Sequence, residues 1–257
     1  MRRITAIAAN TFREAVRDRV LYNLVAFALL LTAAALLVVQ ISIGIERLVV
    51  INLGLTAVSL FGVVIAIFVG VGLVAKEIEK RTLYTVLSRP VRRWEFITGK
   101  FLGLAATLAL NASVMVVGVF LALIYVGHAW QHSDVSVIAA WYFIVLELLI
   151  MTAVTLLFSS FSSPLLSAIF AFAVFVIGSM AEDLRGFARL SRGLSGWLAT
   201  AAAYLVPNFS ALNVIGQAAH GLPISRELIL YNTAYSVAYI LVALSAAVIV
   251  FERRSLK

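Results

Sequence analysis

Long apolar stretches, separated by short charged segments, run along the whole chain. Residues 20–45 and 48–75 contain no Asp, Glu, Lys or Arg, and the charged pair Glu46 and Arg47 lies between them. About 20 apolar residues in a helix span the hydrocarbon core of a bilayer. The pattern therefore predicts six transmembrane helices, at residues 20–45, 48–75, 101–126, 135–158, 164–181 and 228–251.

Serine and proline mark the boundary between the fourth and fifth predicted spans. Serine occupies four of the positions 159–163, and Pro164 follows. Such residues favour a turn, and proline is well suited to the first turn of a new helix. We therefore expect two spans here rather than one long apolar helix.

The composition assigns the chain to the integral membrane proteins. Of its 257 residues, 63% are hydrophobic and 12% are charged, whereas soluble domains contain about half apolar and a quarter charged residues. The fold class expected is an all-α membrane protein with one domain, residues 1–257. The sequence has no cysteine, which excludes disulfides, thiolate metal sites and cysteine nucleophiles.

Basic residues are distributed unequally between the two sides of the predicted membrane domain. If the N-terminus is cytoplasmic, 15 of the 20 Lys and Arg residues fall in cytoplasmic segments. Cytoplasmic loops of membrane proteins carry this excess. We expect both termini to be cytoplasmic, and we interpret the net charge of +8 as an anchor at the lipid surface rather than as affinity for nucleic acid.

Residues 1–19 have the pattern of an amphipathic helix. Ile4, Ile7 and Phe12 recur at helical spacing, and charged residues such as Arg3 and Arg13 occupy the other side. This pattern is typical of a helix that lies in the headgroup plane. A basic segment that only sets the topology is the alternative.

Residues 76–100 join the second and third predicted spans and contain a second pattern of charges. Arg89 precedes Pro90, and the residue before a proline is disfavoured in helices. We expect a short helix before Pro90 and a second one that begins near Arg92 and continues into the third span. Taken alone, the cations of this segment also fit a patch that binds anionic lipid.

A specific motif runs through this segment, made of Glu79, Thr82, Leu83, Leu87, Ser88, Pro90, Val91, Arg93, Glu95, Gly99 and Lys100. The motif resembles the cytoplasmic loop of type-2 ATP-binding-cassette (ABC) exporter permeases, with Arg81 where many members have Gly. Six spans, an amphipathic N-terminal helix and a long outer segment before the last span are similar to that family too. The resemblance implies that residues 76–100 form a coupling helix that docks on a separate ATPase. The coupling residues it implies are Glu79, Arg81, Thr82, Leu83, Ser88, Arg89, Pro90, Arg93, Glu95, Gly99 and Lys100.

The resemblance also implies partners and a location. They are two copies of an ABC ATPase, which bind ATP and Mg²⁺, and a second permease chain, identical or similar, in the plasma membrane of a prokaryote. The chain itself has no Gly-x-x-x-x-Gly-Lys-Ser/Thr segment to hold phosphate. It is therefore not expected to hydrolyse ATP, and export of a substrate that the sequence does not identify is the expected function.

A stripe of small residues runs along the second predicted span. Gly62, Ala66 and Gly70 recur every four residues, so another helix can approach closely. The neighbour is either a helix of the same chain or one of a second permease chain.

Glu147 is the one acidic residue inside a predicted span, where a carboxyl group is costly and marks a functional or paired group. Asn111 lies at a similar depth in the third span, so a hydrogen bond between the two is available. Glu147 either lines the transport pathway, where it meets a cation or a polar substrate, or ties helices together.

Residues 182–227 form the longest predicted outer segment. Within it, residues 194–206 are too few to cross a bilayer, so we expect a re-entrant or interfacial helix that ends at Pro207. His128 and His132, near Asp134, have a spacing that can hold Zn or Cu, although ordinary loop residues explain them as well, and we expect no metal site.

Two other classes of membrane protein fit the sequence less well. A membrane enzyme needs several convergent catalytic groups within the spans, and Glu147 alone is no such constellation. An ion-coupled secondary transporter often shows internal repeats and several buried ionisable groups, and neither is apparent in the sequence.

Overall fold

The computed structural model describes residues 2–39, 44–79, 92–127, 135–190 and 193–253. These residues are all-helical, as predicted, and contain no strand. The helices are α1 (Arg2–Val16), α2 (Arg19–Val39), α3 (Glu46–Glu79), α5 (Arg93–Gly127), α6 (Val135–Ser159), α7 (Pro164–Ser179), α8 (Ala181–Leu190), α9 (Leu194–Leu205), α10 (Ile215–Ala219) and α11 (Arg226–Arg253), with a 3₁₀ turn, η2 (Ser210–Leu212).

Five of these helices are long and apolar enough to cross a membrane: α2, α3, α5, α6 and α11. The number rises to seven if two bent helix pairs each count as one span. One pair is α7 and α8, which meet at 64°, and the other consists of α9 with the segment Ser210–Ala219, at 47°. Helix length and composition thus support a multi-pass membrane protein with five to seven spans.

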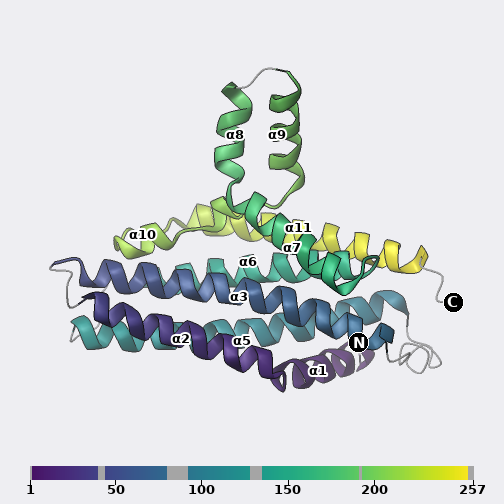
Figure 1. Cartoon of the computed structure of the whole chain (residues 1–257), viewed down its shortest axis with the longest axis horizontal. Coiled ribbons are helices and arrows are strands. Elements are labelled where there is room, and N and C mark those ends of the chain that lie inside the picture. Colours follow the sequence, from purple (N-terminus) through teal and green to yellow (C-terminus); the bar gives the residue numbers. More distant parts are fainter. Residues whose placement is uncertain (1, 40–43, 80–91, 128–134, 191–192, 254–257) are drawn as a thin grey trace.

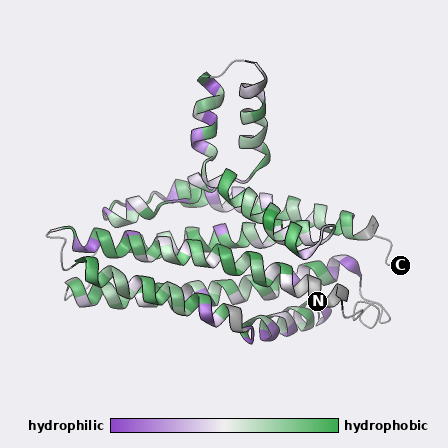
Figure 2. Cartoon of the chain, in the orientation of Figure 1, coloured by the Kyte–Doolittle hydropathy of each residue, from purple (hydrophilic) through white to green (hydrophobic). Residues whose placement is uncertain are grey.

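The long helices lie side by side and form an elongated bundle (Figure 1). Helix α1 packs against α5 at one end of the bundle, the end that also holds the C-terminal turns of α11. Helices α8 and α9 form a hairpin that projects away from the bundle. Hydrophobic residues dominate the bundle, whereas α1 and α8 carry many of the hydrophilic ones (Figure 2).

The serine-rich boundary between α6 and α7 forms as the sequence predicts. The hydroxyls of Ser159 and Ser160 donate to the carbonyls of Leu156 and Leu157, at 3.0 and 2.6 Å. They reinforce the last turn of α6, because the same two carbonyls also accept hydrogen bonds from the backbone N–H of Ser160, at 3.1 and 3.2 Å. Pro164 then opens α7, where its missing N–H costs nothing.

The small-residue stripe of α3 faces α6 of the same chain. A Cβ atom on Gly62 would lie 2.9 Å from a methyl group of Leu148, and one on Gly70 would lie 3.0 Å from Cγ2 of Thr155. Ala66, between them, is buried. Of the two interpretations of this stripe, the structure supports close packing within one chain.

Candidate functional site

Three helices meet at one end of the bundle, where the sequence predicts the cytoplasmic side. Arg93, the first residue of α5, donates from Nη1 to the backbone oxygen of Phe251 on α11, at 2.8 Å. Its guanidinium also lies 5.9 Å from the centre of the Phe251 ring. Phe96 stacks on the same ring, with centroids 6.0 Å apart. The start of α5 is therefore fastened to the end of α11.

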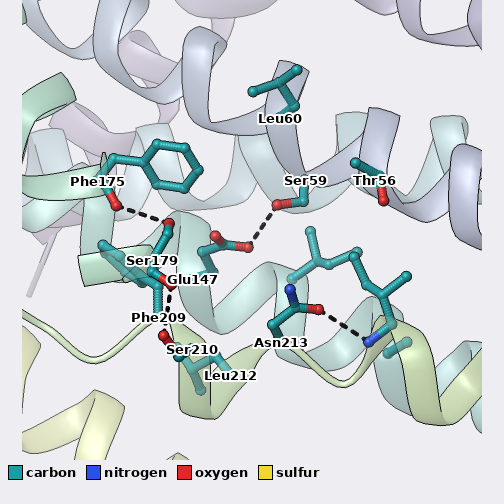
Figure 3. Close-up of a pocket in the computed structure, with 13 residues that line it drawn as sticks. Thr56, Ser59, Leu60, Glu147, Phe175, Ser179, Phe209, Ser210, Leu212 and Asn213 are labelled. Carbon is teal, nitrogen blue, oxygen red and sulfur yellow. Dashed lines mark hydrogen bonds between the residues drawn. The ribbon is translucent and has the colours of Figure 1, made fainter. Parts of the chain in front are cut away.

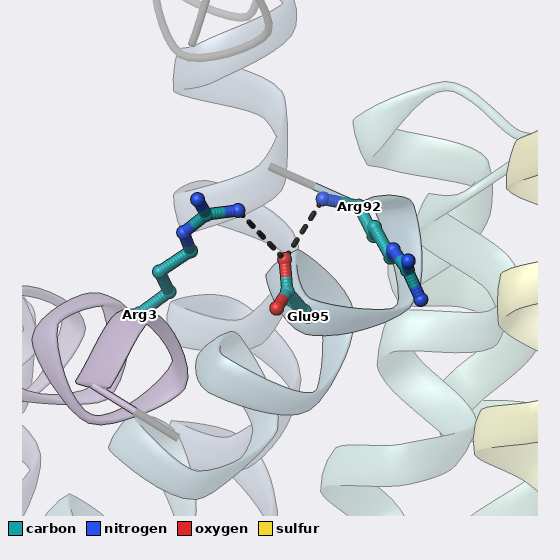
Figure 4. Close-up of polar contacts among 3 residues, drawn as sticks. All are labelled: Arg3, Arg92 and Glu95. Carbon is teal, nitrogen blue, oxygen red and sulfur yellow. Dashed lines mark hydrogen bonds and ion pairs between the residues drawn. The ribbon is translucent and has the colours of Figure 1, made fainter. Parts of the chain in front are cut away.

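Glu95 connects the same end to α1 (Figure 4). Its carboxylate accepts a hydrogen bond from the backbone N–H of Arg92, at 2.9 Å, as a residue in the first turn of a helix does in a capping box. The same oxygen lies 4.0 Å from Nη1 of Arg3. Glu95 thus fixes where α5 begins. Helix α5 continues without a break from Arg93 to Gly127, in agreement with the prediction that a helix beginning near Arg92 continues into the third span.

Gly99 and Lys100 lie inside the chain. A Cβ atom on Gly99 would lie 2.7 Å from the Ile7 side chain of α1, so glycine allows α1 to approach α5. Lys100 is only 2% exposed, and its ammonium lies 5.7 Å from the centre of the Phe96 ring. Both residues therefore take part in packing, and Lys100 is not on a surface that another subunit can reach.

Six of the other predicted coupling residues lie outside the described residues: Arg81, Thr82, Leu83, Ser88, Arg89 and Pro90. Glu79 ends helix α3, and its side chain is also outside the described part. Their contact with an ATPase stays a prediction. His128 and His132 lie outside it as well, and the described residues contain no group of three or more His, Asp or Glu that could hold a metal ion.

Glu147 is the central residue of α6. Its carboxylate accepts a hydrogen bond from the hydroxyl of Ser59 on α3, at 2.9 Å. The bond considered between Glu147 and Asn111 is not formed, because the buried Nδ2 of Asn111 has no hydrogen-bond partner in the structure. The sequence places the two residues at a similar depth, but only the packing of α6 on α3 decides which side chain Glu147 meets.

A cavity of about 200 Å³ opens beside Glu147 (Figure 3). Helices α3, α6 and α7 form its walls, together with η2 and the residues on either side of it. Its polar lining residues, besides Glu147, are Thr56, Ser59, Ser179, Ser210 and Asn213. The cavity therefore presents one carboxyl group and several neutral polar groups within the bundle.

A family model described as "ABC-2 family transporter protein" matches residues 5–256. The chain belongs to the ABC-2 transporter family. The match covers nearly the whole chain and confirms the resemblance found in residues 76–100. A comparison with curated proteins gives no match. As an ABC-2 transporter, the chain is a membrane component of a transport system, consistent with its apolar helices.

The sequence singled out Glu147 in this ABC-2 transporter but missed the residues that surround it. Ser59 lies three residues, about one helical turn, before Gly62, so it borders the stripe that faces α6, and this spacing was a signal that could have found it. Thr56, six residues before Gly62, is off the four-residue spacing of the stripe and could not have been found in this way. Ser210 and Asn213 had no such signal, because they reach the cavity only through the turn between α9 and α10.

Proposed function

We propose that the chain is the membrane-spanning permease subunit of an ATP-driven exporter in the plasma membrane of a prokaryote. Two copies of a separate ATPase, which bind ATP and Mg²⁺, supply the energy. A second permease chain, identical or similar, completes the transport pathway. Each permease chain crosses the membrane six times, and α7 is the fifth and shortest span.

Membership of the ABC-2 transporter family is the first support for this proposal. The second is the absence from the sequence of a phosphate-binding segment of its own. A protein that depends on ATP but cannot bind its phosphates in this way must receive the energy through contact with another subunit.

The observation that carries the proposal is the meeting of α1, α5 and α11 at one end of the bundle. Helix α3 ends at Glu79 and α5 begins at Arg93, so the predicted coupling residues between them connect two long helices directly. Arg93 binds the end of α11, and Glu95 lies beside Arg3 of α1. A subunit that binds residues 80–91 would thus act on several membrane helices at once.

The experiment is to express the chain together with a tagged copy of the ABC ATPase encoded beside it and to measure copurification and ATP hydrolysis. Glu79→Ala and Arg89→Ala should each weaken the association about tenfold, since each removes a charge from a protein interface. Glu227→Ala and Arg226→Ala are the matched controls, because both residues are exposed at the start of α11, away from Arg93.

The controls should copurify as the unaltered chain does. The proposal fails if the ATPase does not associate with the unaltered chain, or if Glu79→Ala and Arg89→Ala both leave association and hydrolysis unchanged. Equal losses in the control variants would likewise contradict it, because the contact would then not be specific to the predicted coupling segment.

A further inference from the structure

The cavity beside Glu147 has the chemistry of a binding site. The carboxylate lies between Ser59 on one side and Ser179 and Ser210 on the other (Figure 3). Packed apolar side chains would fill such a space in an ordinary helix bundle, because cavities reduce stability. Here the bundle instead keeps about 200 Å³ open around a carboxyl group.

Each serine hydroxyl that lines the cavity already donates a hydrogen bond within the chain. Ser59 donates to Glu147, at 2.9 Å, and Ser179 donates to the backbone oxygen of Phe175, at 2.8 Å. Ser210 donates to the backbone oxygen of Ser179, at 2.7 Å. A hydroxyl has one proton and two lone pairs, so all three oxygens can still accept hydrogen bonds from a ligand.

The charge of the lining residues also indicates what kind of ligand the cavity favours. None of the 13 residues that line the cavity is Lys, Arg or His, and Glu147 is the one that can ionise to an anion. A charge far from water needs an opposite charge nearby. The cavity therefore favours a ligand that carries a positive charge and donates hydrogen bonds.

Two aromatic rings give the cavity an apolar wall. Phe175 of α7 and Phe209 both line it, and their ring centroids are 5.9 Å apart. Aromatic faces attract organic cations and pack against their hydrocarbon parts. A volume of about 200 Å³ equals that of roughly seven water molecules. This volume exceeds the size of a bare metal ion and suits an amine with a short carbon chain.

We propose that this cavity binds a small organic ammonium ion, with Glu147 as its counter-ion and the serine oxygens as further acceptors. Three rim residues, Thr56, Ser179 and Asn213, are exposed, so the ligand can enter from the surface of the chain. The inference names a substrate class for the transport proposed above, and only its transport role rests on that proposal.

The direct test is equilibrium dialysis of radiolabelled n-butylamine, which is protonated at pH 7, against the purified chain in lipid nanodiscs. Empty nanodiscs correct for partition into lipid. Unlabelled n-butylamine should displace the label, whereas 1-butanol, which has the same carbon chain without the charge, and KCl at equal ionic strength should not. Displacement by 1-butanol or by KCl would overturn the assignment to an organic cation.

Variants locate the site. Glu147→Gln keeps the size of the side chain but removes the charge, and it should weaken binding at least tenfold, or about 1.4 kcal/mol. Glu227→Gln, at the exposed start of α11, is the matched control and should bind as the unaltered chain does. Unchanged binding in Glu147→Gln would place the ligand elsewhere.

Ser210→Ala is a second variant that tests the site if Glu147→Gln does not fold. It removes one acceptor from the cavity and its hydrogen bond to Ser179 but leaves the carboxylate in place. Binding should weaken severalfold, and full affinity would contradict the proposed site.

The outcomes separate this inference from the transport proposal. If n-butylamine binds the isolated chain through Glu147 but no ATPase copurifies, the binding site stands and the transport proposal fails. If the ATPase associates but n-butylamine does not bind, the transport proposal stands and the inference fails. With both in place, n-butylamine should stimulate ATP hydrolysis in the unaltered complex but not in the Glu147→Gln complex.

Discussion

Gly103 allows α1 to lie directly against α5, and replacing it should loosen α1. A Cβ atom at this position would lie 2.6 Å from the backbone oxygen of Ala8 and 2.6 Å from Cβ of Thr11. Ordinary contacts of a Cβ atom begin at 3.4 Å, so α1 would have to move by about 0.8 Å. Neither of the two atoms can rotate away, because both are fixed to the helix backbone.

The free-energy cost of the substitution follows from this overlap. Overpacking of this kind costs about 1 to 3 kcal/mol. The gain in helix propensity from Gly→Ala does not offset it here, since α5 is helical whether α1 is docked or detached. In Gly103→Ala, the detached population of α1 should therefore rise roughly 5- to 150-fold.

Hydrogen exchange of the α1 backbone amides, measured by mass spectrometry in nanodiscs, reports this population directly. Gly72→Ala is the control, because Gly72 is also in a long helix and no atom lies within 4 Å of its added Cβ. Exchange in α1 should accelerate in Gly103→Ala only. Equal exchange in the two variants would refute the claim that α1 is held by close contact at Gly103.

Two further predictions concern the same end of the bundle. Arg93→Ala removes a charged donor from the Phe251 oxygen, a hydrogen bond worth about 1.5 to 3 kcal/mol, so hydrogen exchange in the last turn of α11 should accelerate. Arg92→Ala, which keeps its backbone bond to Glu95, should not have this effect. Equal hydrogen exchange in the two variants would argue against the link between Arg93 and α11. Because the sequence lacks cysteine, single-cysteine variants can test the topology: an impermeant thiol reagent added to intact cells should label Gln217→Cys but not Ser88→Cys, and the reverse pattern would overturn the predicted orientation.

The existence of the long helices and some of their boundaries could be predicted, because these depend on local sequence. The predicted span 135–158 agrees with α6 to within one residue, and α7 begins at Pro164 as expected. Helix α9, Leu194–Leu205, occupies the segment judged too short to cross a bilayer. Hydropathy and turn chemistry act over a few residues, so a single sequence is enough to read them.

Contacts between helices could not be predicted in the same way. Lys100 carries a charge that suggested a surface position, yet it is buried near the α1–α5 contact, where Phe96 covers its ammonium. Glu147 lies in the middle of α6, as the predicted span implies, but its partner is Ser59 rather than Asn111. Which faces of two helices meet depends on packing across the whole bundle, and hydropathy alone contains too little of that information.

The length of α5 has a mechanical consequence. Its 35 residues correspond to about 52 Å at 1.5 Å per residue, whereas the hydrocarbon core is about 30 Å thick. Roughly 20 Å of an unbroken rod therefore extends beyond the lipid tails or is taken up by tilt. Because a helix without a break moves as one body, a displacement applied at its Arg93 end would also move its far end, at Gly127.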